Sequence, residues 1–551
     1  MNRTTSAGRA VDAVWDRVEA NLATDPRGDD FNTAHEVCSR YRNDPCRLAL
    51  TVYHENGHTE RWTYQELDRA AAKTARVFAD LGLRRGDRVA ALLTRQVETW
   101  ITALAAWRSG LVYVPLFGGF AADAITFRMR AASARAVVVD ASFRAELAIA
   151  QSESSLDLIT VVVNRRNAVP NTGAQVIDDD IDFWSAVDAA DADGPIRPTS
   201  IDDTATLLFT SGTSGTPKAC VMTHAAFVSV IPFAESVLGV REDSSVFTTA
   251  DPAWAFGLYT AGAAPMALGA ARVMYSGRFK PEIWHRVLTD SNATILATAP
   301  SAIRRMAATF ADLGAPQRLR TVAAAGEPLT AAVANDWIAT GAPLLRNGYG
   351  LSEVGMLLGD VDSPGAEITP GMLAQPIPGF EPLLVVDGRP VARGELGQVA
   401  VRRPRYQMSA GYEGRPDLWA SRWLDDAYVT EDVAVIDAAG RWMIQGRSDD
   451  MIITSGHNVS PVEVENALLR HPAVADVAAV THTDPALGDV VRAVVVKNTE
   501  VSVETDLFEM ELKNLVAQHV GKYACPRVVS YARELPRTEV GKLRRSALRS
   551  S

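Results

Sequence analysis

Residues able to do chemistry gather in one loop of this chain, at positions 210–218. An apolar run, 207–209, leads into hydroxyl side chains and glycines and ends at Lys218. Gly212 and Gly215 let the backbone fold back, so that amide hydrogens converge on one point. The hydroxyl donors of the loop are Thr210, Ser211, Thr213 and Ser214. Such a ring of donors with one cation predicts a site for the phosphates of a nucleoside triphosphate.

Two other readings of this loop are less consistent with the sequence. A Ser- and Gly-rich surface linker is rarely preceded by an apolar strand and followed by another apolar segment, 219–222. The commoner phosphate loop, with glycine, four residues and then Gly-Lys-Ser/Thr, is absent, because Lys218 follows Pro217 and precedes Ala219. The loop is therefore a different phosphate-binding motif.

Positions 210–218 resemble the signature loop of the adenylate-forming superfamily, which includes acyl-CoA synthetases, adenylation domains and luciferases. The resemblance extends from about residue 30 to residue 549, with the motifs in family order. It implies an α/β fold: a large N-terminal domain of layered α/β subdomains with mainly parallel sheets and a β-rich subdomain. A small, mobile α+β C-terminal domain follows. The expected boundaries are 1–448 and 449–551, with a hinge near Asp449.

The resemblance also implies a nucleotide site. The segment 347–354 is similar to the family's Tyr-Gly-x-Thr-Glu motif, in which Tyr349 would flank the adenine, Ser352 would bind phosphate and Glu353 would hold Mg²⁺. The segment 325–328 is similar to one that contacts adenine, which adds Gly326, Glu327 and Pro328. Asp432, in a segment similar to Tyr-x-Thr-Gly-Asp, would accept hydrogen bonds from both ribose hydroxyls. Lys218, Gly350 and Arg447 complete the expected nucleotide contacts.

The last hundred residues contain the segments that we expect to move: the hinge, the acceptor loop and the motif with the catalytic lysine. The segment 445–465 resembles the family's hinge region, in which Arg447 would contact ribose or phosphate and Asp449 would be the pivot. After rotation of the C-terminal domain, Gly456, His457 and Asn458 would line the tunnel of the acceptor. The segment 535–545 resembles the family's final motif, with Lys542 as the mobile catalytic lysine. The catalytic residues that the resemblance implies are Thr210, Glu353 and Lys542.

Two segments bear on which acid the enzyme would bind. Trp254, Phe256 and Gly257 match a segment that lines the acid pocket in the family, although aromatic residues in general pack in cores. Short-chain acetyl-CoA synthetases carry a tryptophan at the position that matches Gly350. A glycine there implies a deeper pocket, so we expect a medium-chain or aromatic acid rather than acetate.

CoA is the expected acceptor, with ATP and Mg²⁺, because 117–120 and the C-terminal segments resemble acyl-CoA synthetases and no carrier domain is attached. The alternative is an enzyme of a specialised pathway whose acceptor is a carrier protein or an amine, or which adenylates an unusual anion such as nitrite. A non-catalytic nucleotide-binding homologue and a P-loop hydrolase are further alternatives. Three positions depart from the family pattern: Glu431 replaces glycine, Val540 replaces Ser or Thr, and Ser352 replaces Thr.

These motifs require an alternation of strands and helices to position them. Apolar β-branched runs predict strands at 48–53, 85–93, 136–140, 158–163, 294–298 and 321–325. Thr63 and Glu66 form a capping-box signature for a helix that reaches Leu81 and Gly82, and 99–109 predicts another helix. Strands that alternate with helices indicate βαβ units and a largely parallel sheet.

The composition supports a globular enzyme acting on small molecules. The chain has 551 residues, 47% hydrophobic, which is too long for one core, and its net charge of −11 argues against a nucleic-acid or membrane-surface partner. Four cysteines without metal-ligand spacing, and no leader or membrane-spanning run, predict a cytoplasmic protein. The acidic run 178–182 is interpreted as a solvated loop rather than a metal site. The oligomeric state stays open.

Overall fold

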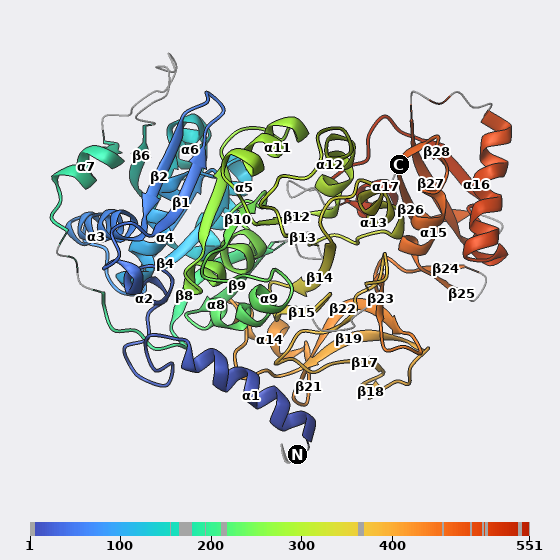
Figure 1. The fold of residues 1–551 in the computed structure, drawn as a ribbon, viewed down its shortest axis with the longest axis horizontal. Coiled ribbons are helices and arrows are strands. Elements are labelled where there is room, and N and C mark those ends of the chain that lie inside the picture. Colours follow the sequence, from blue (N-terminus) through green and yellow to red (C-terminus); the bar gives the residue numbers. More distant parts are fainter. Residues whose placement is uncertain are drawn as a thin grey trace.

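The structure is a computed structural model, and it describes residues 6–154, 156–164, 179–192, 194, 196–210, 217–361, 368–454, 457–484, 488–498, 501, 505–537 and 543–549. Two large sheets with helices around them form most of the molecule, a β-rich part lies beside them, and the C-terminal elements lie at the right of the view (Figure 1). The fold class predicted from the sequence is confirmed. The boundary at residue 448 and the mobility of the C-terminal part stay predictions.

The first sheet carries the phosphate loop. Over the described residues it has eight strands, in the order β20-β9-β8-β4-β3-β5-β6-β7. Their bounds are β3 Arg88–Leu93, β4 Val112–Phe117, β5 Ala134–Asp140, β6 Ile159–Val163, β7 Ile181–Asp182, β8 Thr204–Thr210, β9 Lys218–Thr223 and β20 Ser409–Tyr412. Strands β3 to β8 pair in parallel, whereas β9 and β20 run antiparallel. The phosphate loop therefore starts at the carboxyl edge of parallel strands, the usual place for ligand sites.

The second sheet has nine strands in the described part of the chain, in the order β16-β15-β14-β13-β12-β10-β11-β1-β2. Their bounds are β1 Leu48–Tyr53, β2 Thr59–Thr63, β10 Ser245–Thr248, β11 Ala271–Tyr275, β12 Ile295–Thr298, β13 Thr321–Ala325, β14 Leu345–Leu351, β15 Gly355–Gly359 and β16 Gln375–Pro376. Strands β1 and β10 to β14 are parallel. The edge strands are antiparallel.

Helices cover and separate these sheets (Figure 1). Their bounds are α1 Ser6–Ala20, α2 Thr33–Val37, η1 Ser39–Tyr41, α3 Tyr64–Asp80, α4 Val97–Arg108, α5 Ala122–Ala132, η2 Ala141–Phe143, α6 Arg144–Ser154, α7 Phe183–Ala189, α8 Ala226–Ser229, α9 Ile231–Ser236, η3 Phe256–Ala263, α10 Ala264–Ala267, α11 Pro281–Asp290, α12 Pro300–Leu313, α13 Ala331–Ala339, α14 Pro416–Ala420, α15 Pro461–Leu468, α16 Thr505–His519, η4 Lys522–Ala524 and α17 Arg545–Arg549. Helix η3 is a π-helix.

Two of these helices show how the sequence directs the packing. The backbone N–H of Glu66 donates to Thr63 Oγ1 at 3.2 Å and that of Thr63 to Glu66 Oε2 at 2.8 Å, which confirms the predicted capping box of α3. All residues of α4 are buried. Its two charged side chains have partners, Glu98 the Trp184 indole and Arg108 the Asp68 carboxylate. Helix α4 lies in the largest core, which joins both sheets with η3 and α8 to α10.

The β-rich part is an antiparallel sheet of strands β18-β17-β19-β22-β21, with β23 paired to β22. The bounds are β17 Pro382–Val386, β18 Arg389–Pro390, β19 Leu396–Arg402, β21 Trp423–Leu424, β22 Ala427–Ile436 and β23 Trp442–Arg447. Its register places Asp432 opposite Arg447. Two predicted ribose-binding residues are therefore neighbours across one strand pair.

The C-terminal part has its own sheets and core. Strands β24 Ile452–Thr454 and β25 His457–Val459 form a hairpin, and β26 Val474–Asp484, β27 Gly488–Lys497 and β28 Val528–Tyr531 form a mixed sheet. An apolar core joins this sheet with α15 and α16. Nowhere in the described residues does a helix have the length and apolar character to cross a membrane.

The N-terminal helix α1 fastens the β-rich part to the rest of the molecule. The indole of Trp15 donates to the Gly379 carbonyl at 3.0 Å and packs edge-on against Phe380 and Tyr406. The guanidinium of Arg405 pairs with three carboxylates of α1, those of Asp12, Asp16 and Glu19. These contacts join segments almost four hundred residues apart in the sequence.

The acidic run 178–182 is not simply a solvated loop. The carboxylate of Asp180 is 3% exposed and accepts two hydrogen bonds from Arg144, at 2.7 and 3.0 Å. Asp182 caps α7 by accepting from the Ser185 N–H. The prediction is therefore wrong for Asp180, whose charge is buried and paired with Arg144, whereas Asp182 is partly exposed. Asp178 lies outside the described residues.

Candidate active site

The phosphate loop starts and ends at two residues that face each other. Thr210, the last residue of β8, pairs across the sheet with Lys218, the first residue of β9. Lys218 is buried, and its Nζ lies 5.4 Å from the centre of the Tyr412 ring. The structure thus brings together the two ends of the predicted cradle. Its other residues, Ser211, Gly212, Thr213, Ser214 and Gly215, lie outside the described part of the chain.

Glu353 lies in the turn after β14 and is positioned by β20. The hydroxyl of Tyr412 donates to Glu353 Oε1 at 2.8 Å, and the Ser409 N–H donates to the Glu353 carbonyl at 3.2 Å. The hydroxyl of Tyr428 lies 3.3 Å from that of Tyr412. Burial, followed by the charge of Glu353, raises the pKa of Tyr412, so the phenol remains a donor at neutral pH. A tyrosine of the first sheet therefore orients the carboxylate of the second.

The surroundings of Glu353 fit a magnesium ion. Lys218 and Glu353 both contact Tyr412, so the carboxylate lies beside the end of the phosphate loop. Mg²⁺ prefers oxygen ligands and is commonly held by one or two carboxylates together with substrate phosphates. The described residues contain no cluster of three or more His, Cys, Asp or Glu that could hold a metal without such a substrate. One carboxylate beside a phosphate site is the donor set that a nucleotide-bound magnesium requires.

The predicted adenosine contacts come together between β14 and β22. The hydroxyl of Tyr349 donates to Asp432 Oδ2 at 2.6 Å, and the Asp432 N–H donates to Thr430 Oγ1 at 3.1 Å. Burial, followed by the charge of Asp432, raises the pKa of Tyr349, which keeps this phenol protonated. Two residues separated by 83 positions in sequence are therefore joined directly.

The segment after β13 lies at the same edge. Ala325 and Gly348 pair across β13 and β14, so Gly326 follows immediately beside the strand that carries Tyr349. Gly326 has a φ of +92°, which favours glycine. The carboxylate of Glu327 accepts from the N–H and hydroxyl of Ser301, both at 3.2 Å, and so ties this turn to α12. Pro328 follows in the same turn, and Ser352 lies in the turn that carries Glu353.

The predicted acid pocket begins at η3. The rings of Trp254 and Phe117 lie 6.4 Å apart, and Trp254 and Phe256 are partly exposed. At Gly257, a Cβ would lie 2.3 Å from the Asp251 carbonyl, so only glycine fits. π-Helices are rare and are frequent at functional sites. The acid pocket assigned to these residues stays a prediction that the helix type favours.

Gly350 does not leave open space beside its backbone. A Cβ at this position would lie 2.3 Å from the Gly355 carbonyl oxygen and 2.8 Å from the Met356 sulfur. Strand β15, which is paired to β14 here, fills the direction in which a side chain would project. The missing side chain therefore does not by itself deepen a pocket, and the preference for a longer acid stays a prediction.

We expect Gly350→Ala to lower the free energy of unfolding by about 1–3 kcal/mol, because the added methyl forces β14 away from β15. Chemical denaturation of the purified protein measures this. Gly411→Ala is the matched control, since no atom lies within 4 Å of its added Cβ. Equal stability of the two variants would contradict the close strand approach.

Glu431, which replaces a glycine of the family pattern, holds two arginines. Its carboxylate pairs with Arg422 and with Arg447, and the Ser448 N–H donates to its carbonyl at 2.7 Å. Burial raises the pKa of Glu431, but the hydrogen bonds and charges of Arg447 and Arg422 outweigh burial and lower it. Arg447 also donates to Asp449 at 2.9 Å. The arginine predicted to bind the nucleotide is therefore already paired with protein carboxylates.

We expect Glu431→Gln to lower the KM for ATP about three- to tenfold, the equivalent of roughly 1 kcal/mol. The change removes one of the carboxylates that hold Arg447, Asp449 being another, and so removes a negative charge beside a polyanionic substrate. Steady-state kinetics at saturating acid measures it. The control is Asp437→Asn, which breaks an ion pair with Arg441 further along the same chain segment. A raised KM for ATP in Glu431→Gln would show that Glu431 instead orients Arg447 for binding.

Several hydrogen bonds and ion pairs surround the predicted hinge. The Asp449 carbonyl accepts from Arg549 at 3.0 Å, and Asp450 pairs with Arg549 at 2.7 Å. Between the large and small parts, Arg304 of α12 lies 3.5 Å from Asp476 of β26. His457 and Asn458 form part of β25. Gly456, Val540 and Lys542 lie outside the described residues.

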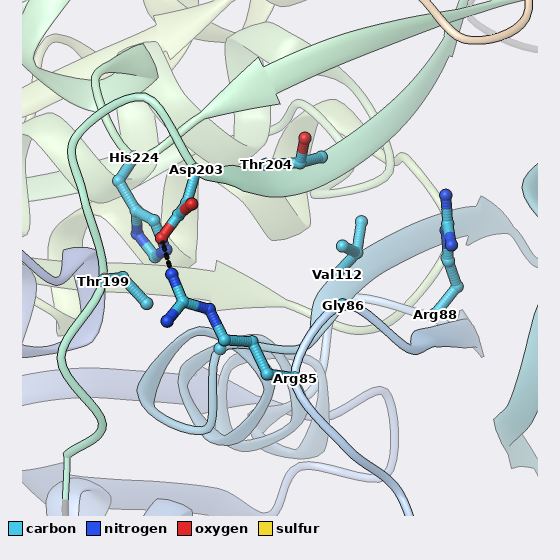
Figure 2. Close-up of a pocket in the computed structure, with 9 residues that line it drawn as sticks. Arg85, Gly86, Arg88, Val112, Thr199, Asp203, Thr204 and His224 are labelled. Atoms are coloured by element: carbon cyan, nitrogen blue, oxygen red, sulfur yellow. Dashed lines mark hydrogen bonds and ion pairs between the residues drawn. The ribbon is translucent and has the colours of Figure 1, made fainter.

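A cavity of about 250 Å³ lies away from these residues (Figure 2). It is lined by Thr204 at the start of β8, together with His224, Asp203 and Arg85, of which the last two form an ion pair. Thr210 lies at the other end of β8, about 20 Å away at the usual rise of a strand. The cavity is therefore separate from the candidate active site.

Sequence reasoning missed three residues of the site. Tyr412 carries no spacing signal, because tyrosines in strands are ordinarily packing residues. Tyr428 begins the segment similar to Tyr-x-Thr-Gly-Asp, but no role was assigned to it. Arg422 becomes a partner of Glu431 only through the hairpin of β21 and β22. The carboxylate at position 431 was noted as a departure from the family pattern, but the arginines that pair with it can be identified only from the fold.

Comparison with known proteins agrees with this geometry. The AMP-binding enzyme family matches residues 37–413, and the AMP-binding enzyme C-terminal domain matches residues 463–542. The acyl-CoA ligase YtcI of Bacillus subtilis, described as uncharacterized, is 30% identical over 514 residues, covering 91% of this chain and 93% of the relative.

Solved structures show the same fold. An acyl-CoA synthetase of Brucella canis has a TM-score of 0.75 at 30% identity, covering 97% of this chain and 96% of the other. The anthranilate CoA ligase AuaEII, in complex with anthranoyl-AMP, has a TM-score of 0.83 at 23% identity, covering 95% and 97%. The order of motifs, the contacts of Tyr412 with Glu353 and Lys218, the hydrogen bond from Tyr349 to Asp432, and these matches lead to one assignment: this chain belongs to the AMP-binding enzyme family, within the adenylate-forming superfamily.

Proposed function

We propose that this chain is an AMP-forming acid–CoA ligase that activates a medium-chain or aromatic acid through an acyl-adenylate. Two observations carry the proposal: Tyr412 contacts both Glu353 and Lys218 at the end of the phosphate loop, and Tyr349 donates a hydrogen bond to Asp432. These residues supply a phosphate site, a carboxylate for a metal and a ribose acceptor. Relatives described as acyl-CoA ligases support the reaction class.

In the first half-reaction, a carboxylate oxygen of the acid attacks the α-phosphorus of ATP, and pyrophosphate leaves. Two anions must approach, so catalysis rests on positioning and on opposing positive potential. Lys218, the loop amides and Lys542 supply this potential. Magnesium held by Glu353, when bound, adds positive charge at the phosphates. No side-chain nucleophile is required.

Asp432 and Tyr349 orient the nucleoside in this scheme. The Asp432 carboxylate already accepts one hydrogen bond from Tyr349, and its remaining lone pairs accept from the ribose hydroxyls. Gly326 and Pro328 border the same strand edge, where the adenine lies. Arg447 reaches ribose or phosphate after leaving Glu431.

In the second half-reaction, the sulfur of CoA attacks the acyl carbonyl and AMP leaves, giving the thioester. The C-terminal domain rotates about Asp449 between the two half-reactions, a hinge-type rearrangement. Rotation brings the loop with Gly456, His457 and Asn458 toward the acceptor. The pairs of Arg447 with Glu431 and Asp449 are the contacts that such a rotation rearranges.

Release of pyrophosphate from a panel of aliphatic, aromatic and amino-substituted acids, each with and without CoA, tests the proposal. We expect at least one acid to release pyrophosphate and CoA to convert it into a thioester, seen by mass spectrometry. Adenylation without thioester formation would replace CoA by another acceptor, such as a carrier protein or an amine. ATP binding without pyrophosphate release from any acid would make the chain a non-catalytic homologue.

A further inference from the structure

Arg272 of β11 is a charge buried without a polar partner. It is 0% exposed, and Nε, Nη1 and Nη2 all lack hydrogen-bond partners among the described residues. Its guanidinium carbon lies 4.6 Å from the centre of the Trp100 ring, on α4. Burial lowers the pKa of Arg272 to about 9, so the group is still cationic at neutral pH. Nothing in the proposed adenylation chemistry uses it.

Such an arrangement is expensive for a folded protein. An uncompensated buried charge destabilises the folded state even after relaxation, and apolar residues of similar volume often replace buried charges without loss of stability. A stacked aromatic ring offsets only part of this cost. Each unsatisfied buried group in a native protein therefore needs an explanation, and a ligand that supplies the missing acceptor is one.

Arg272 faces the helical layer between the two sheets. Met274, two residues along β11, belongs to the core shared with α4 and η3, whereas Val273 and Tyr275 belong to the core on the other face. Because strand side chains alternate between faces, Arg272 points with Met274. Its guanidinium therefore lies on the side of the sheet where η3 lies.

Helix η3 connects this guanidinium to the predicted acid pocket. A Cβ on Gly262 would lie 3.1 Å from Arg272 Nη1, 3.0 Å from the Trp100 ring and 2.5 Å from the Gly257 carbonyl oxygen. Gly262 thus contacts Arg272 without an intervening side chain, and Gly257 belongs to the segment assigned to the acid. Trp254 and Phe256 are partly exposed, whereas the following residues of η3, from Gly257 to Ala263, are buried.

We propose that Arg272 forms the closed end of the acid pocket and pairs with a second carboxylate on the substrate, so that the enzyme activates dicarboxylic acids. The guanidinium fork matches a carboxylate in a bidentate fashion. Trp100 Nε1, which is also buried and without a partner in the described part of the chain, supplies a further donor. One carboxylate reacts at the α-phosphate while the other compensates the buried charge. This inference rests on the proposed ligase function.

The test compares matched acids on the full-length enzyme. Pyrophosphate release with ATP and CoA is measured for monocarboxylic and dicarboxylic acids of equal length, such as hexanoate and adipate, and for benzoate and terephthalate. We expect kcat/KM to favour the diacid about 10–100-fold, as a buried charge-assisted pair gives. A preference for the monoacid overturns this inference alone. Release from no acid overturns the proposed ligase function itself.

The Arg272→Met variant distinguishes a role of Arg272 in substrate binding from a structural role. We expect this variant to lose the diacid preference, to retain or gain activity on monoacids, and to melt at the same or a higher temperature, because an unpaired buried charge is removed. Arg272→Lys keeps the charge but not the fork and should recover the preference in part. Arg320→Met, a surface arginine near Asp243, is the control. A lower melting temperature with equal loss on both acid classes would show that Arg272 is structural and overturn the proposal.

Discussion

Replacing Glu353 with glutamine is expected to slow pyrophosphate release on the order of 10²–10³-fold, the loss seen when one preorganised electrostatic group is removed. An amide keeps the size of the side chain and can still accept the hydrogen bond from Tyr412. It has no charge with which to hold Mg²⁺ against water. The expected defect is therefore in adenylation and in the Mg²⁺ concentration that half-saturates it, measured by magnesium titration at saturating ATP.

Tyr412→Phe is the companion variant for Glu353. It removes the donor that fixes Oε1 but leaves the carboxylate charge, so we expect a smaller loss and a nearly unchanged magnesium requirement. If Glu353→Gln retained full activity with an unchanged magnesium requirement, another group would have to hold the metal. The assignment of Glu353 would then be wrong even if the ligase reaction were confirmed.

Lys542→Ala is expected to reduce pyrophosphate release on the order of 10²–10³-fold by the same reasoning, because a cation that opposes the charge of the reacting phosphates is lost. The effect should be confined to one half-reaction. With chemically prepared acyl-adenylate and CoA, the variant should form thioester at close to the wild-type rate, since that step displaces AMP from an already activated acyl group.

Lys522→Ala, which changes another lysine of the C-terminal part, provides the control for Lys542. It removes the same charge from a short helix, η4, that belongs to the C-terminal core and not to the final motif. Equal losses in both variants would show that the general positive charge of this segment acts, rather than a single catalytic lysine. Equal loss in both half-reactions of Lys542→Ala would point to a folding defect.

The elements that were predicted from the sequence are those with strong local signals. The capping box of Thr63 and Glu66, and the apolar runs that became β1, β12 and β13, need no tertiary information to be found. The pairings of distant segments were accessible only through the family resemblance. Composition alone does not predict that β20 pairs with β9, a strand almost two hundred residues earlier in the chain.

The motifs assigned candidate site residues one at a time, but they did not give the pairs in which those residues are held. Glu353 and Asp432 were found as single residues, but their partners Tyr412 and Tyr349 were assigned other roles or none. Arg272 was missed because an arginine in a strand gives no signal until its burial is known. The prediction of a solvated Asp180 was wrong for the opposite reason: its charge suggested exposure, but Arg144 pairs with it in the interior.

The docking of α1 has a consequence for synthesis of the chain. Trp15 and the acids of α1 emerge first from the ribosome, but their partners Gly379, Phe380 and Arg405 are made much later. At synthesis rates of about 5–20 residues per second, the helix waits roughly 20–80 seconds for them. Until then the Trp15 indole lacks both its hydrogen-bond acceptor and its aromatic neighbours, so α1 docks onto the β-rich part only late in synthesis, after residues 379–406 have been made.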